Sequence, residues 1–446
     1  MYLSTFISYK TINYWLIILL YCIISFFSGI LADPKTIIMI HVFFLFFSLI
    51  FQSILIDRRY LWKIILLALL IRVSLYGHIL TNDEFTWKLS ALFSMDDTLN
   101  WFTYLIGYVL ESFNDGIIPP INYLETFGAS NGVFYSYISG FFLFILNAKS
   151  FQDGLVYLPL LNFVFFTLSL YYFNKLVIDV SHSSKIAVVA LCFLAFSPQI
   201  FFWNFFALKH SFLLLLIVLL TYNISRFIST RKLMYFLIYI LLSIIMFKDR
   251  IYLGYFSFIT LFFVTVAMYG DGSFFRGLKR PKVFTAFIVL IIVLYPYIHD
   301  LIVGNYVYFN RSAVISETGL LQLLRLENNP FFGFLRILIT PLPFRVTEYS
   351  SIDLIMQFSF FTQVPLVIFS FYGLVLLYKY NRRYLYIVMP LYLFYFIFSF
   401  YSPGANRVRD TLFPLLVLLA SIGFCTFIER IDKYKQKRLE ALLRQN

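Results

Sequence analysis

The chain has 446 residues, of which 61% are hydrophobic and 13% are charged, and its mean hydropathy is +0.84. Soluble domains carry about 25% charged residues, so this composition excludes a soluble globular protein. The net charge of +13 would also suit a nucleic-acid-binding protein, but the basic residues lie in short gaps between long apolar stretches. This arrangement is typical of cytoplasmic loops, so the sequence predicts a lipid bilayer as partner and no nucleic acid.

Apolar stretches recur along the chain, and many are long enough to cross a hydrocarbon core of about 30 Å. Helices are the expected spanning structure because each satisfies its backbone groups within its own segment. When every basic gap is placed on the cytoplasmic side, the pattern predicts an all-α polytopic membrane protein with about 12 transmembrane helices and both termini inside. The predicted spans are 14–31, 37–56, 61–80, 153–176, 186–204, 210–226, 233–248, 251–268, 283–301, 356–378, 384–401 and 409–428.

The spans and loops read as a single membrane-embedded domain, residues 1–446, of a bacterial cytoplasmic (inner) membrane. The segment 14–31 lacks a small-residue cleavage site and is interpreted as a retained helix. Gly132 to Ala148 is also apolar, but a full span there would move every later basic cluster outside, so we expect a juxtamembrane helix. In order, the predicted parts are three N-terminal spans (1–80), an outer catalytic loop (81–152), core spans (153–301), a second outer loop (302–355), three last spans (356–428) and a basic cytoplasmic tail (429–446).

An acidic pair, Asp83-Glu84, opens the first outer loop directly after the third predicted span. A carboxylate held where a helix leaves the membrane sits in a partly dry environment, which raises its pKa and suits a general base. The same pair also fits an interfacial acidic turn that stays hydrated and has no catalytic role. The residues by themselves leave both interpretations open.

The acidic pair is followed by an aromatic juxtamembrane helix, a span entered through Pro and Asn, a span ending in Ser-Pro, an outer turn, a further span and a basic outer turn. An Arg-and-Pro entry precedes the last span. This order resembles the GT-C superfamily, the multispanning glycosyltransferases that take sugars from polyprenyl-phosphate carriers. The segments that carry the resemblance are Asp83-Glu84, Phe134–Tyr137, Leu158–Asn162, Ser197-Pro198, Trp203–His210, Ser211–Arg226, Met246–Arg250 and Arg407–Pro414.

The resemblance implies a glycosyltransferase that moves a sugar from a polyprenyl-phosphate carrier to a glycan or lipid-linked acceptor on the outer face. Such an enzyme would serve surface polysaccharide assembly, namely O-antigen, capsule or lipopolysaccharide. It further implies that Asp83 is the catalytic base, with Glu84 as second candidate or as a hydrogen-bond partner of the substrate. The sequence shows no metal-ligand spacing, so it gives no support for a cofactor or a divalent ion.

The departing anionic phosphate also requires cations, and arginine suits phosphate through paired N–H donors. Outer loops are normally poor in Lys and Arg, so a set of outer-face cations is unusual. Individually, each could instead extend to lipid headgroups or pair with Asp249, Glu348, Asp353 or Asp410. The candidate phosphate-binding residues are Arg250, Arg407, Arg409, Lys209, His210, Lys248, Arg336 and Arg345.

Two other functions are alternatives to the glycosyltransferase. A Wzy-type polymerase would also use polyprenyl-linked glycans, from a diphosphate oligosaccharide donor, and would use the arginines of the loop from Ile302 to Ile355. A lipid-linked glycan flippase or transporter would need a polar cavity open alternately to each side, and the spans show few charges deep in the membrane. Arg72, inside the third span, is the exception, and a lipid phosphate and a buried carboxylate are equally suitable partners for it.

Overall fold

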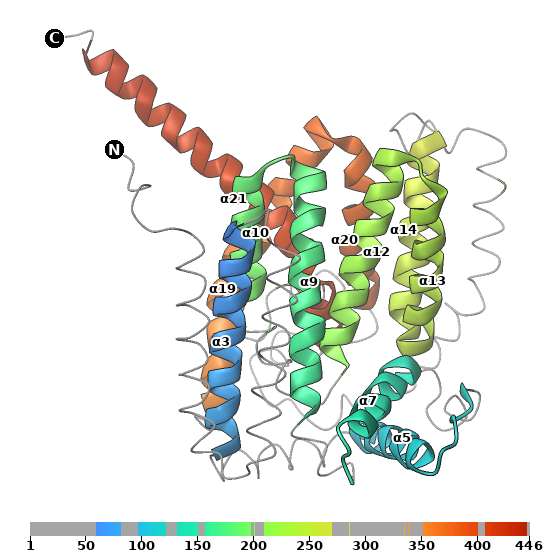
Figure 1. Cartoon of the computed structure of the whole chain (residues 1–446). Coiled ribbons are helices and arrows are strands. Elements are labelled where there is room, and N and C mark those ends of the chain that lie inside the picture. The colour runs from blue at the N-terminus through green and yellow to red at the C-terminus, as the bar shows by residue number, and fades with distance from the viewer. Residues whose placement is uncertain are drawn as a thin grey trace, which may run out of the picture. The chain divides into compact units, whose positions relative to one another are not determined.

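The computed structural model describes residues 59–81, 97–121, 132–149, 157–197, 200, 209–269, 285, 334, 338, 351–399 and 406–443. Within these ranges the chain forms eleven helices and no strand, which confirms the all-α prediction for the described residues (Figure 1). The predicted spans 14–31 and 37–56, nearly all of 283–301 and nearly all of the second outer loop lie outside the described residues.

The helices follow the predicted spans closely where both exist. Helix α9 starts later than predicted, at a Leu-Pro pair, because proline is well tolerated in the first turn of a helix. Helix α10 ends at Ala195, before the predicted end at residue 204. The helices are α3 (Arg59–Thr81), α5 (Asp97–Asn114), α7 (Val133–Ile145), α9 (Leu158–Ser181), α10 (Ser184–Ala195), α12 (His210–Thr230), α13 (Leu233–Asp249), α14 (Ile251–Tyr269), α19 (Ser351–Tyr380), α20 (Arg382–Ser399) and α21 (Asn406–Leu443).

Five of the described helices contain segments long and apolar enough to cross a membrane, which supports the prediction of a membrane protein. The juxtamembrane segment predicted from Gly132 to Ala148 forms the shorter apolar helix α7. The count of about twelve spans and the GT-C architecture stay predictions. The five segments are Leu158–Ser181, His210–Thr230, Ile251–Met268, Thr362–Tyr380 and Asp410–Arg438.

The chain divides into two compact units. The first comprises residues 1–129, 135–167 and 204–208, and the second comprises residues 130–134, 168–203 and 209–446. In the first unit, α5 and α7 pack at Gly140, where an added methyl group would collide with the side chain of Val109. The ring of Phe113 lies 5.6 Å from that of Tyr137 and 5.4 Å from that of Phe141, so aromatic contacts fix this pair.

In the second unit, very short turns connect neighbouring helices, so that consecutive helices run side by side in opposite directions (Figure 1). Arg231 ends α12 in the left-handed conformation at φ 58°, and Lys232 precedes α13. Arg250 alone separates α13 from α14, and Asn381 alone separates α19 from α20. These turns place Lys209, at the start of α12, at the same end of the unit as Arg250.

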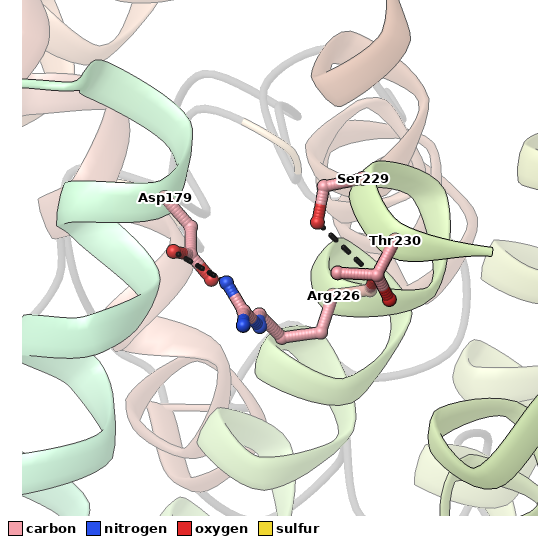
Figure 2. Close-up of polar contacts among 4 residues, drawn as sticks. All are labelled: Asp179, Arg226, Ser229 and Thr230. Carbon is pink, nitrogen blue, oxygen red and sulfur yellow. Dashed lines mark hydrogen bonds and ion pairs between the residues drawn. The ribbon is translucent and has the colours of Figure 1, made fainter. Parts of the chain in front are cut away.

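The opposite end of the second unit is rich in basic residues. Arg226 Nη1 lies 3.3 Å from Asp179 Oδ1, and Ser229 and Thr230 donate hydrogen bonds to the main-chain oxygen of Arg226 (Figure 2). Lys185 Nζ lies 3.7 Å from Glu429 Oε1 on α21. We call this region, defined by Asp179, Lys185, Arg226 and Glu429, the basic end. The basic turns after α9 and α12, predicted to share one side of the membrane, therefore lie at one end of the unit.

Candidate functional site

The structure describes only part of the predicted site. Asp83, Glu84, Arg336 and Arg345 lie outside the described residues. Arg407 and Arg409 lie in the first turn of α21, but their side chains are not described. The remaining predicted phosphate-binding residues, Lys209, His210, Lys248 and Arg250, are described together with their surroundings.

These four residues come from two turns that are distant in sequence and meet in the second unit. Lys209 immediately precedes α12, and His210 is its first residue. Lys248 and Asp249 end α13, and Arg250 leads into α14. The ammonium of Lys209 donates a hydrogen bond of 3.0 Å to the main-chain oxygen of Asp249, 40 residues away. We call Lys209, His210, Lys248, Asp249 and Arg250 the cationic cluster.

Helix termini explain why this contact forms. The last carbonyl groups of a helix have no partner within the helix and carry a partial negative charge, so they attract cations. Lys209 satisfies the terminal carbonyl of α13 in this way. At the start of α7, the N–H of Phe134 donates a 2.7 Å hydrogen bond to Asp249 Oδ1. The carboxylate therefore caps a helix N-terminus, where negative charge is favourable.

Burial of the cluster makes the charged form of its side chains costly unless a nearby group compensates the charge. Asp249 is fully buried, Lys209 is 1% exposed and His210 is 6% exposed. Burial lowers the pKa of Lys209 well below that of an ordinary lysine, the neighbouring Arg250 lowers it further, and Asp249 partly opposes the shift. A buried ammonium is stable in a protein only when negative groups compensate it, and Asp249 supplies part of that compensation.

Lys248 and Arg250 are half-buried and so reach the surface of the cluster. The Arg250 guanidinium lies 5.7 Å from the centroid of the Tyr252 ring, which restricts its orientation. The tight turn from α13 to α14 needs a small residue at position 254, because a methyl group on Gly254 would lie 2.7 Å from the Cα of Phe247. The turn thus holds Arg250 in a defined position beside Lys209.

The arrangement favours binding of an anion. Lys209 and Arg250 are partly or wholly removed from water, and a cation attracts an anion more strongly at such a site than in water. Asp249 caps α7, so its carboxylate is already engaged as a hydrogen-bond acceptor. Lys209 contacts the main-chain oxygen of Asp249, so the ordinary alternative from sequence, an ion pair between an outer cation and the Asp249 carboxylate, stays a prediction. Lys209 therefore has a structural role whether or not it contacts a substrate.

Two further buried polar groups lie in the first unit, and the sequence indicated some of their residues but not their surroundings. Tyr135, Ser139 and Asn162 are fully buried, and the Tyr135 hydroxyl lies beside the other two side chains. Arg72 is fully buried, lies 3.9 Å from the Phe166 ring centroid and donates a hydrogen bond to the main-chain oxygen of Ala68. Asn162 and Arg72 were visible as polar residues in apolar spans, but their partners depend on packing.

Among the described residues there is no group of three or more His, Cys, Asp or Glu side chains placed to hold a metal ion. Comparison with known proteins gives no match: no protein-family model, no curated protein and no solved structure is similar to this chain.

Proposed function

We propose that the protein is a membrane glycosyltransferase of GT-C type that transfers a sugar from a polyprenyl-phosphate carrier to an acceptor at the membrane surface. The observation that carries this proposal is the convergence of Lys209 and Arg250, from two separate turns, in one partly buried cluster. A lipid-linked phosphate needs such cations at the surface of the membrane.

The position of the cluster agrees with a substrate anchored in one leaflet. Lys209 precedes α12 and Arg226 lies four residues before its end, so the two are 17 positions apart, or about 26 Å along the helix axis. This distance is close to the thickness of a hydrocarbon core, about 30 Å. The cationic cluster and the basic end therefore suit opposite faces of the bilayer, and under the predicted orientation the cluster faces outward.

In the proposed reaction the acceptor hydroxyl attacks the anomeric carbon of the donor sugar. The new bond joins the acceptor oxygen to this carbon, and the bond from the carbon to the phosphate oxygen breaks. The hydroxyl proton passes to the base, for which Asp83 is the candidate and Glu84 the second choice. Polyprenyl phosphate leaves with the bonding electrons, and Arg250, with Lys209 and Lys248 nearby, stabilises its negative charge.

The test is sugar transfer by the purified protein from a polyprenyl-monophosphate sugar, with donor affinity measured separately. Asp83→Asn should bind donor normally and transfer about 10²- to 10⁴-fold more slowly, because general-base catalysis typically contributes that much. Arg250→Lys should weaken donor binding despite its retained charge, because lysine lacks the paired donors. Arg382→Lys, an exposed arginine outside the cluster, is the matched control and should behave as the parent.

The donor also separates the proposal from its nearest alternative. A polymerase would extend a polyprenyl-diphosphate oligosaccharide and would ignore the monophosphate sugar. If neither donor is turned over, the proposed transferase activity is wrong. If both Asp83→Asn and Glu84→Gln transfer sugar at the parent rate, the assignment of the catalytic base to the first outer loop is wrong.

A further inference from the structure

A groove of about 830 Å³ opens between α19 and α21 in the second unit, away from the cationic cluster. Its floor is apolar and aromatic, formed largely by Ile368, Phe369 and Phe427. One wall is the part of α21 from Arg430 to Arg438, which follows the apolar part of this helix. Here Arg430, Lys435 and Arg438 contribute three cations, and none of the nine lining residues is acidic.

Close packing of the two helices creates the floor of this groove. A methyl group on Gly373 would collide with the main-chain oxygen of Leu419, and one on Gly423 with that of Phe369. The helices therefore approach as closely as backbones allow, and Phe369 packs against Phe424 and Phe427 with ring centroids 5.2 and 5.6 Å apart. Beyond this contact α21 continues to Leu443 and extends from the bundle (Figure 1).

Lining residues of α21 recur at helical spacing, so Phe427, Ile431, Tyr434, Lys435 and Arg438 share one face. The apolar members precede most of the charged ones along this face. Arg430 also lies 5.6 Å from the ring centroid of Tyr372, which orients its guanidinium toward the groove. The groove therefore has an apolar zone beside Phe427 and a cationic zone further along α21 toward its C-terminus.

We propose that this groove is a binding site for an anionic phospholipid of the leaflet at the basic end. An acyl chain would lie on Ile368, Phe369 and Phe427, and Arg430, Lys435 and Arg438 would hold the phosphate and headgroup. Ile368 is 62% exposed and Phe427 is 43% exposed, as expected for side chains that contact lipid. The three cations, with no acidic lining residue, select a negative headgroup over a zwitterionic one. This site is independent of the proposed transferase reaction.

The test measures lipid binding by the full-length protein, stripped of lipid in detergent, with native mass spectrometry as readout. Phosphatidylglycerol and phosphatidylcholine with the same acyl chains are titrated separately. We expect a preference for phosphatidylglycerol that falls at least about tenfold in Arg430→Gln/Arg438→Gln. The charge-matched control Lys433→Gln/Lys437→Gln removes two exposed lysines of the same helix that do not line the groove, and should keep the parent preference.

A second variant and a competitor distinguish loss of the binding site from other causes of weaker lipid binding. Arg430→Lys/Arg438→Lys retains the charges and should keep most of the preference, which excludes misfolding as the cause of a loss. Glycerol 3-phosphate should not displace the lipid, since it lacks the acyl chain. The proposal is overturned if both double Gln variants lose the preference equally, if glycerol 3-phosphate competes, or if a photo-cross-linker at Tyr434 captures a protein instead of lipid.

Discussion

Asp249 links three segments of the chain, so its replacement gives the most informative test of the cationic cluster. Its carboxylate accepts the Phe134 N–H at 2.7 Å, its main-chain oxygen accepts from Lys209, and it is fully buried. Asp249→Asn keeps an oxygen for Phe134 but removes the negative charge beside Lys209 and Arg250. Asp249→Ala removes both the charge and the acceptor.

The expected losses follow from these contacts. A hydrogen bond to a charged group contributes about 1 kcal/mol more than a neutral one, and buried cations lose their countercharge, so Asp249→Asn should cost about 2 kcal/mol. Asp249→Ala also removes the cap of α7, and its cost should reach about 3 to 5 kcal/mol. Unfolding in mixed micelles, followed by near-UV circular dichroism during titration with sodium dodecyl sulfate, measures these differences.

A double-mutant cycle identifies the cause. Lys209→Met in the Asp249→Asn background removes the uncompensated ammonium, so the double variant should be more stable than the sum of the two single losses predicts. Asp432→Asn, on an exposed turn of α21, is the control and should leave the unfolding curve unchanged. The electrostatic account of the cluster is refuted if Asp249→Asn unfolds as the parent does, or if the two single effects simply add.

Three further predictions address other parts of the chain. Burial and Arg250 lower the pKa of Lys209, so its ammonium loses its proton at a lower pH than an ordinary lysine does, and donor binding should weaken as the pH rises through that range. Lys209→Arg should extend donor binding to higher pH, and identical pH profiles for the variant and the parent would exclude a charged role for Lys209. Gly423→Ala should destabilise the protein by about 1 to 3 kcal/mol in the same unfolding assay, because the added methyl collides with the carbonyl of Phe369; an unchanged curve would contradict the close packing of α19 and α21. In a protein lacking its native cysteines, an impermeant thiol reagent applied to intact cells should label Ile118→Cys and spare Tyr434→Cys, and the reverse pattern would invert the predicted orientation.

The sequence predicted helix positions well where apolar runs end at charged residues. Helices α12, α13 and α14 are separated by Arg231-Lys232 and Arg250, and their predicted spans at 210–226, 233–248 and 251–268 differ from the structure by few residues. The continuation of α21 to Leu443 was not predicted, because a hydropathy pattern marks where the apolar segment ends and not where the helix ends.

The contacts of the site were harder to predict than its residues. Lys209 and Arg250 were recognised as unusual cations, and Asp249 as a possible ion-pair partner, from charge and position alone. The role of Asp249 as a cap for α7 depends on two segments more than 100 residues apart, which no local pattern encodes. Likewise, an arginine in a span indicated that Arg72 needs a partner, but the ring of Phe166 is indistinguishable in sequence from many other phenylalanines.

The two cationic surfaces of the second unit constrain each other. A lipid-linked donor has its phosphate in one leaflet, so it can occupy the cationic cluster or the groove on α21, but not both, because Lys209 in the cluster and Arg226 at the basic end stand about 26 Å apart along α12. The cluster is partly buried, Lys209 is held by the main-chain oxygen of Asp249, and Arg250 lies against the Tyr252 ring, as a site that must position a reacting phosphate requires. The groove is open and its cations, Arg430, Lys435 and Arg438, are exposed, so it does not hold a phosphate in one fixed position. Reaction geometry therefore favours the cluster for the donor, and the groove for lipid that stays bound without reacting.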